Sequence, residues 1–301
     1  GNDSIIHRAF KWGNLFNLIM LDTRYEGRDS SLGAPIPNNA PVLIDTNRRM
    51  LGVTQLNWFK NELSDTTTQW KIIGNQVMIA PLVGLGLVFN GDQWDGYPAE
   101  RKRVLNYIMQ NNIKDVVFCT GDIHSSWAND IPHPDSTYNS STGAGSVATE
   151  FIGTSVTSTA VGLTGLQTII QTANPHIKYV DLTKRGYCLL DINKHRVQGD
   201  YIHISNDASR VYTTSDDAQW MNLDGERFLR HASSVLGPRT GNPDLVPFIT
   251  DVSEIKKEDN MMLNGCYPNP AQNQVAVQYY LFKPSEVKIL LTDLSGRVVY
   301  Q

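Results

Sequence analysis

The chain has 301 residues, and its 26 lysine and arginine residues against 30 aspartate and glutamate residues give a formal net charge of −4. This acidic balance excludes a nucleic-acid binder that depends on a strongly basic surface. Hydrophobic residues make up 41% of the chain, and no apolar run of the sequence approaches the ~20 residues of a transmembrane helix. The composition therefore predicts a globular protein with one large domain and room for a smaller one.

The beginning of the sequence and its cysteines say little about the protein's compartment. The chain starts with Gly1 rather than methionine, and no charged segment followed by an apolar run, as in a signal peptide, comes after it. Cys119, Cys188 and Cys266 have no zinc-type spacing, and their odd number does not favour a disulfide framework. We expect the chain to be a piece of a longer protein.

The first half of the sequence alternates strand-like and helix-like segments. Near-continuous apolar runs predict buried strands at Phe16–Asp22, Trp70–Asn75 and Lys114–Gly121. Apolar residues three and four apart predict helices at Thr54–Leu63 and from Pro98 to about residue 112, the second with proline in its first turn. Strands that alternate with helices are typical of a layered α/β fold, which is the predicted fold class.

From residue 147 onward the composition favours strands. β-branched and aromatic residues predict strands at Val147–Ile152, Gly186–Ile192 and Val197–Ile204. Residues 154–172 are rich in serine, threonine and glycine, which predicts a long surface loop with one helical turn. The polar span 205–264 has few apolar runs, so we predict an extension and linker there.

The last segment has the pattern of a separate β unit. Alternating residues predict strands at Gln274–Leu281, Val287–Thr292 and Arg297–Tyr300, with a turn at Asp293–Gly296. Three strands without a second sheet bury too little surface to be stable alone, so we expect a small β-sandwich that begins here and is cut off. The predicted division of the chain is residues 1–204, 205–264 and 265–301.

The residues best suited to chemistry follow the third predicted strand. Asp122 and His124 stand two positions apart, so an extended chain would point both side chains to the same side. A carboxylate oxygen with an imidazole nitrogen suits Fe, Mn or Zn, and the carboxylate alone suits Ca²⁺. The alternative is that Asp122 caps a turn and that His124 is satisfied within the fold.

Asn75 occupies the equivalent place after the preceding predicted strand. Ligands of open α/β sheets gather beyond the carboxyl ends of the strands, so the two polar turns could face one cleft. The amide oxygen of Asn75 is a group that a hard cation accepts. The alternative is a left-handed turn residue, since asparagine tolerates that conformation well.

Two further groups favour structural roles. Asp92, Asp95 and Glu100 could form the rim of a cation or substrate site, but solvated acids before a helix are also favoured by the helix dipole. Arg24 could place its guanidinium on a phosphate, or it could pair with Asp22 within the fold. The sequence contains no serine nucleophile elbow, Walker loop or dinucleotide fingerprint, and it identifies no substrate-binding residue.

A series of motifs in fixed order carries a family resemblance. They are Met20-Leu-Asp-Thr-Arg24, Trp70-Lys-Ile-Ile-Gly-Asn-Gln-Val77, Trp94-Asp-Gly-Tyr-Pro-Ala-Glu-Arg101, Thr120-Gly-Asp-Ile-His-Ser-Ser-Trp127, Glu150-Phe-Ile-Gly-Thr-Ser-Val-Thr-Ser158, Asn174-Pro-His176 and Arg185-Gly-Tyr187. Over about residues 5–203 the chain resembles the C-terminal half of a PhoD-like alkaline phosphatase/phosphodiesterase. The resemblance implies a partial metallophosphoesterase-like αββα sandwich, a site with Fe³⁺ and Ca²⁺, and attack of a metal-bound hydroxide on the phosphorus of a phosphate ester.

The resemblance also implies the metal ligands. Asp122 and His124 match metal-binding positions of the family's Gly-Asp-x-His motif, and Asn75 stands where related enzymes have a metal-binding asparagine. Gln76 follows it where the wider superfamily has histidine. The family's earlier ligands, which include a cysteine, would lie upstream, and Cys119 lies in an apolar run and does not replace that cysteine. We therefore expect a partial metal site, and an isolated piece that is inactive and poorly folded.

The tail, from Tyr267-Pro-Asn-Pro270 to Gly296-Arg-Val-Val299, resembles the type IX secretion C-terminal sorting domain of Bacteroidota. That resemblance implies the type IX secretion machinery as a partner and export through the periplasm to the outside or the cell surface. The resulting hypothesis is a secreted metal-dependent phosphoesterase. The alternative is a non-catalytic binding module presented on the surface, whereas a metal-dependent nuclease is disfavoured because no basic track is present in the sequence.

Overall fold

The computed structural model describes residues 5–33, 35–209 and 211–237, and further along the chain residues 261–267, 276–284, 287–289, 291–292 and 298–300. Contacts divide the chain into two compact units, Gly1–Leu236 and Gly237–Gln301. Each unit is described by itself.

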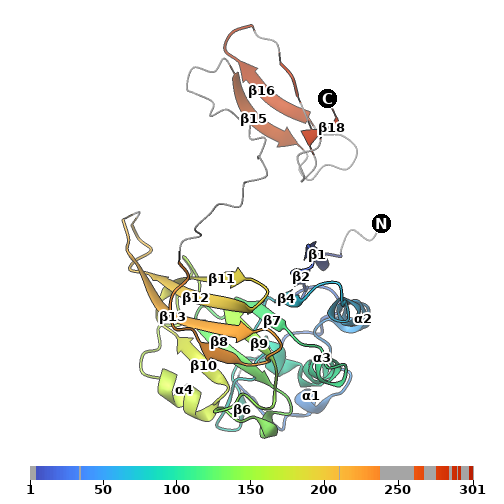
Figure 1. The fold of residues 1–301 in the computed structure, drawn as a ribbon, viewed down its shortest axis with the longest axis vertical. Helices are drawn as coiled ribbons and strands as arrows, with labels where there is room; N and C mark the ends of the chain where they lie inside the picture. The colour runs from blue at the N-terminus through green and yellow to red at the C-terminus, as the bar shows by residue number, and fades with distance from the viewer. Residues whose placement is uncertain are drawn as a thin grey trace. The chain divides into compact units, whose positions relative to one another are not determined.

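A mixed β-sheet forms the centre of the first unit (Figure 1). Within the described residues it has seven strands in the order β1-β2-β4-β7-β9-β8-β10. They are β1 Arg8–Trp12, β2 Phe16–Met20, β4 Trp70–Gly74, β7 Val116–Thr120, β8 Ser126–Pro132, β9 Ser146–Ile152 and β10 Ile177–Asp181. Strands β2, β4, β7 and β9 run parallel, so their carboxyl ends meet at one edge of the sheet.

A second, antiparallel sheet packs against one face of this main sheet. Its described strands are β11 Arg185–Ile192, β12 Arg196–Ile204, β13 Thr214–Leu223 and β14 Leu229–His231, paired in that order. Trp70, Phe151 and Tyr201 are buried between the two sheets. Gly199 of β12 leaves room for the Phe151 ring, because a Cβ atom at Gly199 would lie 2.6 Å from that ring. Close packing here therefore requires glycine on β12.

Helices cover the other face of the main sheet (Figure 1). They are α2 Gly52–Leu63 and α3 Pro98–Gln110, and the short helix α1 Pro41–Ile44 contacts α3. Along β4, Ile73 packs in the core under the helices, whereas Trp70 and Ile72 pack in the core between the sheets. A strand buried on both faces gives a continuous apolar run, which is why the sequence predicted β4. The predicted α/β layering is confirmed.

Short elements complete the first unit. They are β3 Ile36–Pro37, β5 Val83–Gly84, β6 Leu87–Val88, the 3₁₀ turns Trp94–Gly96 and Asp135–Thr137, and helix α4 Gln167–Ala173. Strands β3, β6 and β5 form a small sheet of their own. Helix α4 lies at the end of the loop that was predicted to contain one helical turn.

The prediction of an extension and linker over residues 205–264 is wrong for residues 214–223, 229–231 and 261–264, which lie in strands. Residues 214–223 and 229–231 form β13 and β14 of the second sheet. The first four residues of β13 are exposed and only Ala218 and Asn222 are buried, so the segment has the polar composition of a linker. Pairing with β12, rather than apolar content, makes it a strand. Residues 238–260 lie outside the described residues, and the predicted domain boundaries stay a prediction.

The second unit has two described strand pairs. Strand β15 Met261–Tyr267 pairs with β16 Ala276–Leu281, and β17 Leu291–Thr292 pairs with β18 Val298–Tyr300. Strands β16 and β18 lie within the strands predicted at Gln274–Leu281 and Arg297–Tyr300. Of the strand predicted at Val287–Thr292, residues 291–292 are a strand and residues 287–289 are not. The predicted turn at residues 293–296 lies outside the described residues.

Asp115 ties the two sheets of the first unit together. It lies in the loop between α3 and β7, and its Oδ1 accepts a hydrogen bond of 2.7 Å from the backbone N–H of Gly225. Burial, opposed by that hydrogen bond and aided by the charge of Asp224, raises the pKa of Asp115 to about 6. The pKa of Asp115 in the folded protein lies above the unfolded value of about 3.9, so the folded protein binds this proton more tightly. Asp115 therefore contributes favourably to the free energy of unfolding below about pH 4, and this contribution is lost as the pH rises through about 6.

Asp115→Asn is expected to stabilise the protein at pH 7.5 by about 1 kcal/mol. Asparagine keeps the acceptor oxygen for Gly225, tolerates the φ of 59° at this position, and removes the buried charge. Urea unfolding at pH 4 and pH 7.5 measures the effect, and we expect the two stabilities to differ less in the variant than in the wild type. A variant that is less stable than the wild type at pH 7.5 contradicts this account.

Candidate active site

The loops that follow β2, β4 and β7 meet at the carboxyl edge of the main sheet. Backbone hydrogen bonds continue just beyond the strands, from Leu21 N to Gly74 O at 2.9 Å and from Asn75 N to Cys119 O at 3.0 Å. The loop with Asn75 therefore lies between the loop with Arg24 and the loop with Asp122.

The loop after β7 is not extended. Asp122 and His124 have φ angles of 70° and 53°, which are left-handed conformations that few residues other than glycine adopt. The prediction that this loop is extended, with both side chains on the same side, is therefore wrong. Both residues are exposed, and two strained positions in one short loop are typical of functional sites.

The ring of His124 is oriented by a backbone carbonyl. Its Nδ1 lies 3.0 Å from the carbonyl oxygen of Thr159. A carbonyl oxygen only accepts hydrogen bonds, so Nδ1 is the donor, and in the neutral ring Nε2 carries the free lone pair. This arrangement is usual for histidines that bind metal ions through Nε2. The alternative that His124 is satisfied within the fold accounts for only one of its two nitrogens.

A row of alternating charges runs beside this loop. The guanidinium of Arg24 pairs with Asp122 through Nη2 and with Asp92 through Nη1, the latter at 2.5 Å. Arg28 contacts the other oxygen of Asp92 at 2.6 Å. Burial alone would raise the pKa of Asp92, but hydrogen bonds from both arginines hold it well below its usual range. Burial by itself would lower the pKa of Arg24, but the two carboxylates of Asp92 and Asp122 outweigh burial and raise it.

These contacts decide between the alternatives for Arg24 and the acids. The carboxylate of Asp22 accepts the backbone N–H of Arg24 at 2.9 Å, while the guanidinium of Arg24 reaches Asp92 and Asp122 instead. Asp95 and Glu100 are buried, not solvated as predicted. Asp95 pairs with Arg101 at 2.7 Å and Glu100 accepts the N–H of Leu51 at 2.6 Å, so both have structural roles. Asp92 differs from these two acids, because it is partly exposed and pairs with Arg24 and Arg28.

Asn75 is 5% exposed and is held on both sides of its amide. Its Nδ2 donates to Val77 O at 2.6 Å and to Thr120 Oγ1 at 3.2 Å, and its Oδ1 accepts from Trp94 Nε1 at 3.2 Å. Asn75 is not among the residues with positive φ, so the left-handed alternative does not apply. One lone pair of Oδ1 remains for a further partner.

Comparison with known proteins identifies the family at this point. The model of the PhoD-like phosphatase family matches residues 1–201. The chain belongs to the PhoD-like phosphatase family. The secretion system C-terminal sorting domain matches residues 265–301, and this type of signal points to secretion or the cell surface. Both resemblances that the sequence motifs predicted are confirmed.

Two relatives measure the extent of the similarity. The chain is 34% identical over 206 residues to alkaline phosphatase D of Bacillus subtilis (strain 168), which covers 67% of this chain and 34% of that protein. A solved structure of PhoD superimposes with a TM-score of 0.67 at 30% identity, covering 76% of this chain and 44% of that one. The α/β fold is confirmed, and the chain spans about a third of the curated relative that it matches.

In this PhoD-like chain Gln76 connects two of the loops. Its Oε1 accepts from the N–H and hydroxyl of Thr23 at 2.9 and 2.7 Å, and its Nε2 donates to Leu21 O at 2.7 Å. Gln76 is thus a structural residue whose side-chain atoms already have partners. It fixes the loop with Arg24 against the loop with Asn75.

Glu150 of β9 is a residue that the sequence analysis missed. It is fully buried and accepts hydrogen bonds from the N–H groups of Ile79 and Ala80 at 2.9 and 3.1 Å, from Thr120 Oγ1 at 2.7 Å and from Asn129 Nδ2 at 3.1 Å. Burial raises the pKa of Glu150, and these four donors oppose that rise. A glutamate within an apolar strand was the available signal, because a buried acid needs partners.

Ser126, His203 and Asp217 form a hydrogen-bonded series that resembles a serine hydrolase triad. Ser126 Oγ lies 3.0 Å from His203 Nε2, and His203 Nδ1 lies 2.8 Å from Asp217. This order of groups is that of a serine hydrolase. Ser126 is 1% exposed between the two sheets, however, so a substrate cannot reach it. These hydrogen bonds connect Ser126 of the main sheet to His203 and Asp217 of the second sheet.

Over the described ranges, no group of three or more histidine, cysteine, aspartate or glutamate side chains could hold a metal ion. Asp122 and His124, with Asn75 on the neighbouring loop, stay the predicted ligands.

In the part of the chain that the structure describes, no helix is long and apolar enough to cross a membrane.

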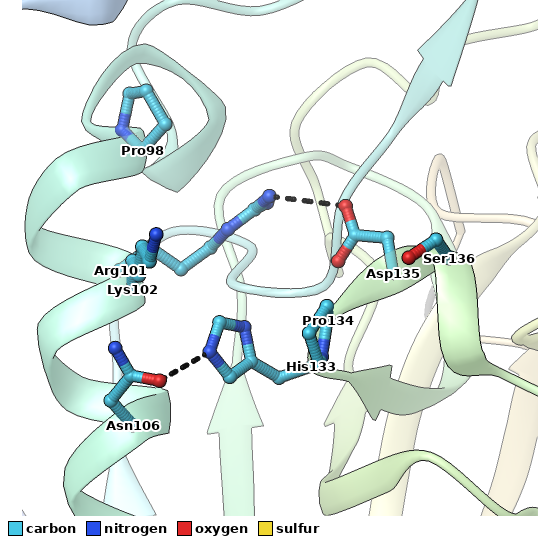
Figure 2. Close-up of a pocket in the computed structure, with 8 residues that line it drawn as sticks. All are labelled: Pro98, Arg101, Lys102, Asn106, His133, Pro134, Asp135 and Ser136. Atoms are coloured by element: carbon cyan, nitrogen blue, oxygen red, sulfur yellow. Dashed lines mark hydrogen bonds and ion pairs between the residues drawn. The ribbon is translucent and has the colours of Figure 1, made fainter.

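A pocket of about 430 Å³ next to α3 has a different character (Figure 2). Four of its polar side chains form two pairs, His133 with Asn106 at 2.8 Å and Arg101 with Asp135 at 3.8 Å. Burial lowers the pKa of His133, which favours its neutral form. None of the predicted ligands lines this pocket, so it is not part of the candidate active site.

Proposed function

We propose that the protein is a secreted, metal-dependent phosphoesterase in which Asp122, His124 and Asn75 bind part of the metal centre. Membership of the PhoD-like phosphatase family supports a hydrolase that acts on phosphate esters, and the sorting domain supports export with the type IX secretion machinery as partner. One observation carries the proposal. Asp122 and His124 lie in the same loop at the carboxyl edge of the sheet, and the Thr159 carbonyl holds the His124 ring so that Nε2 is left for a metal ion.

The donor set fits the proposed Fe³⁺ and Ca²⁺. A carboxylate oxygen suits both ions, imidazole suits iron, and the remaining lone pair of the Asn75 amide oxygen suits calcium. When bound, such ions supply positive charge that neutralises the phosphate and activates the attacking water. We also propose that further ligands lie upstream of this sequence in the full-length protein, as the family resemblance implies.

Arg24 has the position of a phosphate-binding residue in this proposal. It is 31% exposed and lies between Asp92 and Asp122. If Asp122 binds a cation, the guanidinium keeps Asp92 as one partner and has donors left for a phosphate oxygen. Asp92 and Arg28 then hold Arg24 in place while the ester binds.

The test uses the full-length protein and chromogenic phosphate monoesters and diesters. We expect hydrolysis that is lost after treatment with a chelator and restored by iron together with Ca²⁺. The ratio of monoester to diester turnover assigns the phosphatase or phosphodiesterase class. A folded, metal-loaded protein that hydrolyses neither ester contradicts the proposal and favours the surface-presented binding module.

A further inference from the structure

A second pocket, of about 480 Å³, lies directly beside the candidate active site. It is lined by the β5–β6 hairpin, the loop after β7, part of the loop 154–166 and helix α4. Ile123, which stands between Asp122 and His124, contributes to its wall. On another side, Val161 lines the pocket two residues after Thr159, the residue that orients His124. The volume is typical of small-molecule sites.

The pocket presents hydrocarbon to its occupant. The residues that line it include no charged side chain, and most of their polar atoms have partners within the protein. Ser125 Oγ donates to Ile123 O and accepts from Trp127 Nε1 at 2.7 Å. Asn174 bonds the N–H and the carbonyl of Val83, each at 3.0 Å, and Asn90 Oδ1 accepts from the N–H of Asp92. A polar ligand would lose its hydrogen bonds to water without replacement, so the pocket favours an apolar group.

The mouth of the pocket carries exposed apolar side chains that folding does not explain. Leu85 is 93% exposed at the tip of the β5–β6 hairpin and has a φ of 52°. Asparagine or glycine would adopt this conformation at lower cost, so the local backbone does not account for a leucine at this position. Ile169 of α4, at the same pocket, is 64% exposed. Apolar groups gathered at a pocket mouth are typical of a ligand site.

We propose that this pocket binds the hydrocarbon part of the substrate, so that the preferred substrates are phosphate esters of alcohols with an alkyl chain. The phosphate would lie at Asp122 and His124, and the chain would extend past Ile123 toward α4 and the β5–β6 hairpin. This proposal rests on the proposed function for the place of the phosphate. The affinity of the pocket for an alkyl chain does not depend on turnover.

The first arm of the test compares methyl and hexyl diesters of p-nitrophenyl phosphate with the metal-loaded full-length protein. Burial of each methylene contributes up to about fourfold in affinity, so we expect kcat/KM to be at least about 30-fold higher for the hexyl ester. Leu85→Asn combined with Ile169→Gln is expected to lower this ratio severalfold and to leave hydrolysis of the methyl ester unchanged. Both positions are exposed, and asparagine suits the backbone at residue 85. Val53→Gln, on the exposed face of α2, is the control and keeps the ratio.

The second arm measures binding without turnover. Calorimetry with hexylphosphonate and methylphosphonate on the chelator-treated full-length protein is expected to give tighter binding and a more negative heat-capacity change for the hexyl compound. Chain-dependent binding that the double variant weakens supports the pocket even if no ester is hydrolysed, in which case the proposed function alone fails. Hydrolysis of methyl and hexyl esters at equal rates, with equal binding of the two phosphonates, overturns the inference and leaves the proposed function intact.

Discussion

Asp122→Asn is expected to lower the kcat/KM of the metal-loaded full-length protein by more than about 100-fold. Loss of groups that only support metal ligands costs about 10- to 100-fold, so loss of a ligand itself costs more. Asparagine keeps the shape of the side chain and tolerates the left-handed backbone at this position, so the fold stays intact. Metal content after dialysis, measured beside activity, is expected to fall in the same variant.

Asp92→Asn is the matched control for this experiment. Asp92 and Asp122 both pair with Arg24, but only Asp122 is a proposed ligand. The control therefore removes the same kind of ion pair and should retain the metal, with a loss of about tenfold at most. Equal losses of activity and metal in the two variants would mean that Asp122 acts through Arg24 and is not a ligand.

Glu150→Gln is expected to reduce the free energy of unfolding by about 2–4 kcal/mol. Each carboxylate oxygen accepts two hydrogen bonds, so the glutamine NH₂ group would face two donors and leave them without an acceptor. An unsatisfied buried polar group costs about 1–3 kcal/mol. The loss is a large part of the ~5–15 kcal/mol that a domain has in total.

Urea unfolding measures this loss, with Glu226→Gln as the control. Glu226 pairs only with Arg230 among the contacts described for its carboxylate, and that pair is on the surface, so its replacement should cost less than about 1 kcal/mol. A Glu150→Gln variant within about 0.5 kcal/mol of the wild type would mean that the carboxylate is already protonated in the fold.

The sequence predicted strands β2, β4, β7 and β9 of the main sheet but not β1, β8 and β10, and β8 shows why. Strands β4 and β7 are buried on both faces and have continuous apolar sequences. Strand β8 is equally buried, yet its sequence contains Ser126, Asn129, Asp130 and Pro132. Distant residues supply partners for several of these groups: Glu150 accepts from Nδ2 of Asn129, and Tyr138 and the N–H of Leu229 donate to Asp130. Local composition cannot reveal such partners, so β8 has the sequence of a surface loop.

The same limit applies to the candidate site. The motifs placed Asn75 and Asp122 after adjacent strands, and the parallel topology brings those loops together. The ion pairs of Arg24 join residues 68 and 98 positions apart in the chain, and nothing in their spacing indicates them. The left-handed backbone at Asp122 and His124 also depends on the packing of the loop, not on residue type alone.

The contacts of Gln76 have a consequence for motion at the site. Movement of the loop with Arg24 away from the loop with Asn75 would break three hydrogen bonds, two from Thr23 and one to Leu21. The two loops are therefore coupled, because displacing one of them without the other costs all three hydrogen bonds. Ile123, in the loop after β7, lies between Asp122 and His124 in the sequence and lines the apolar pocket.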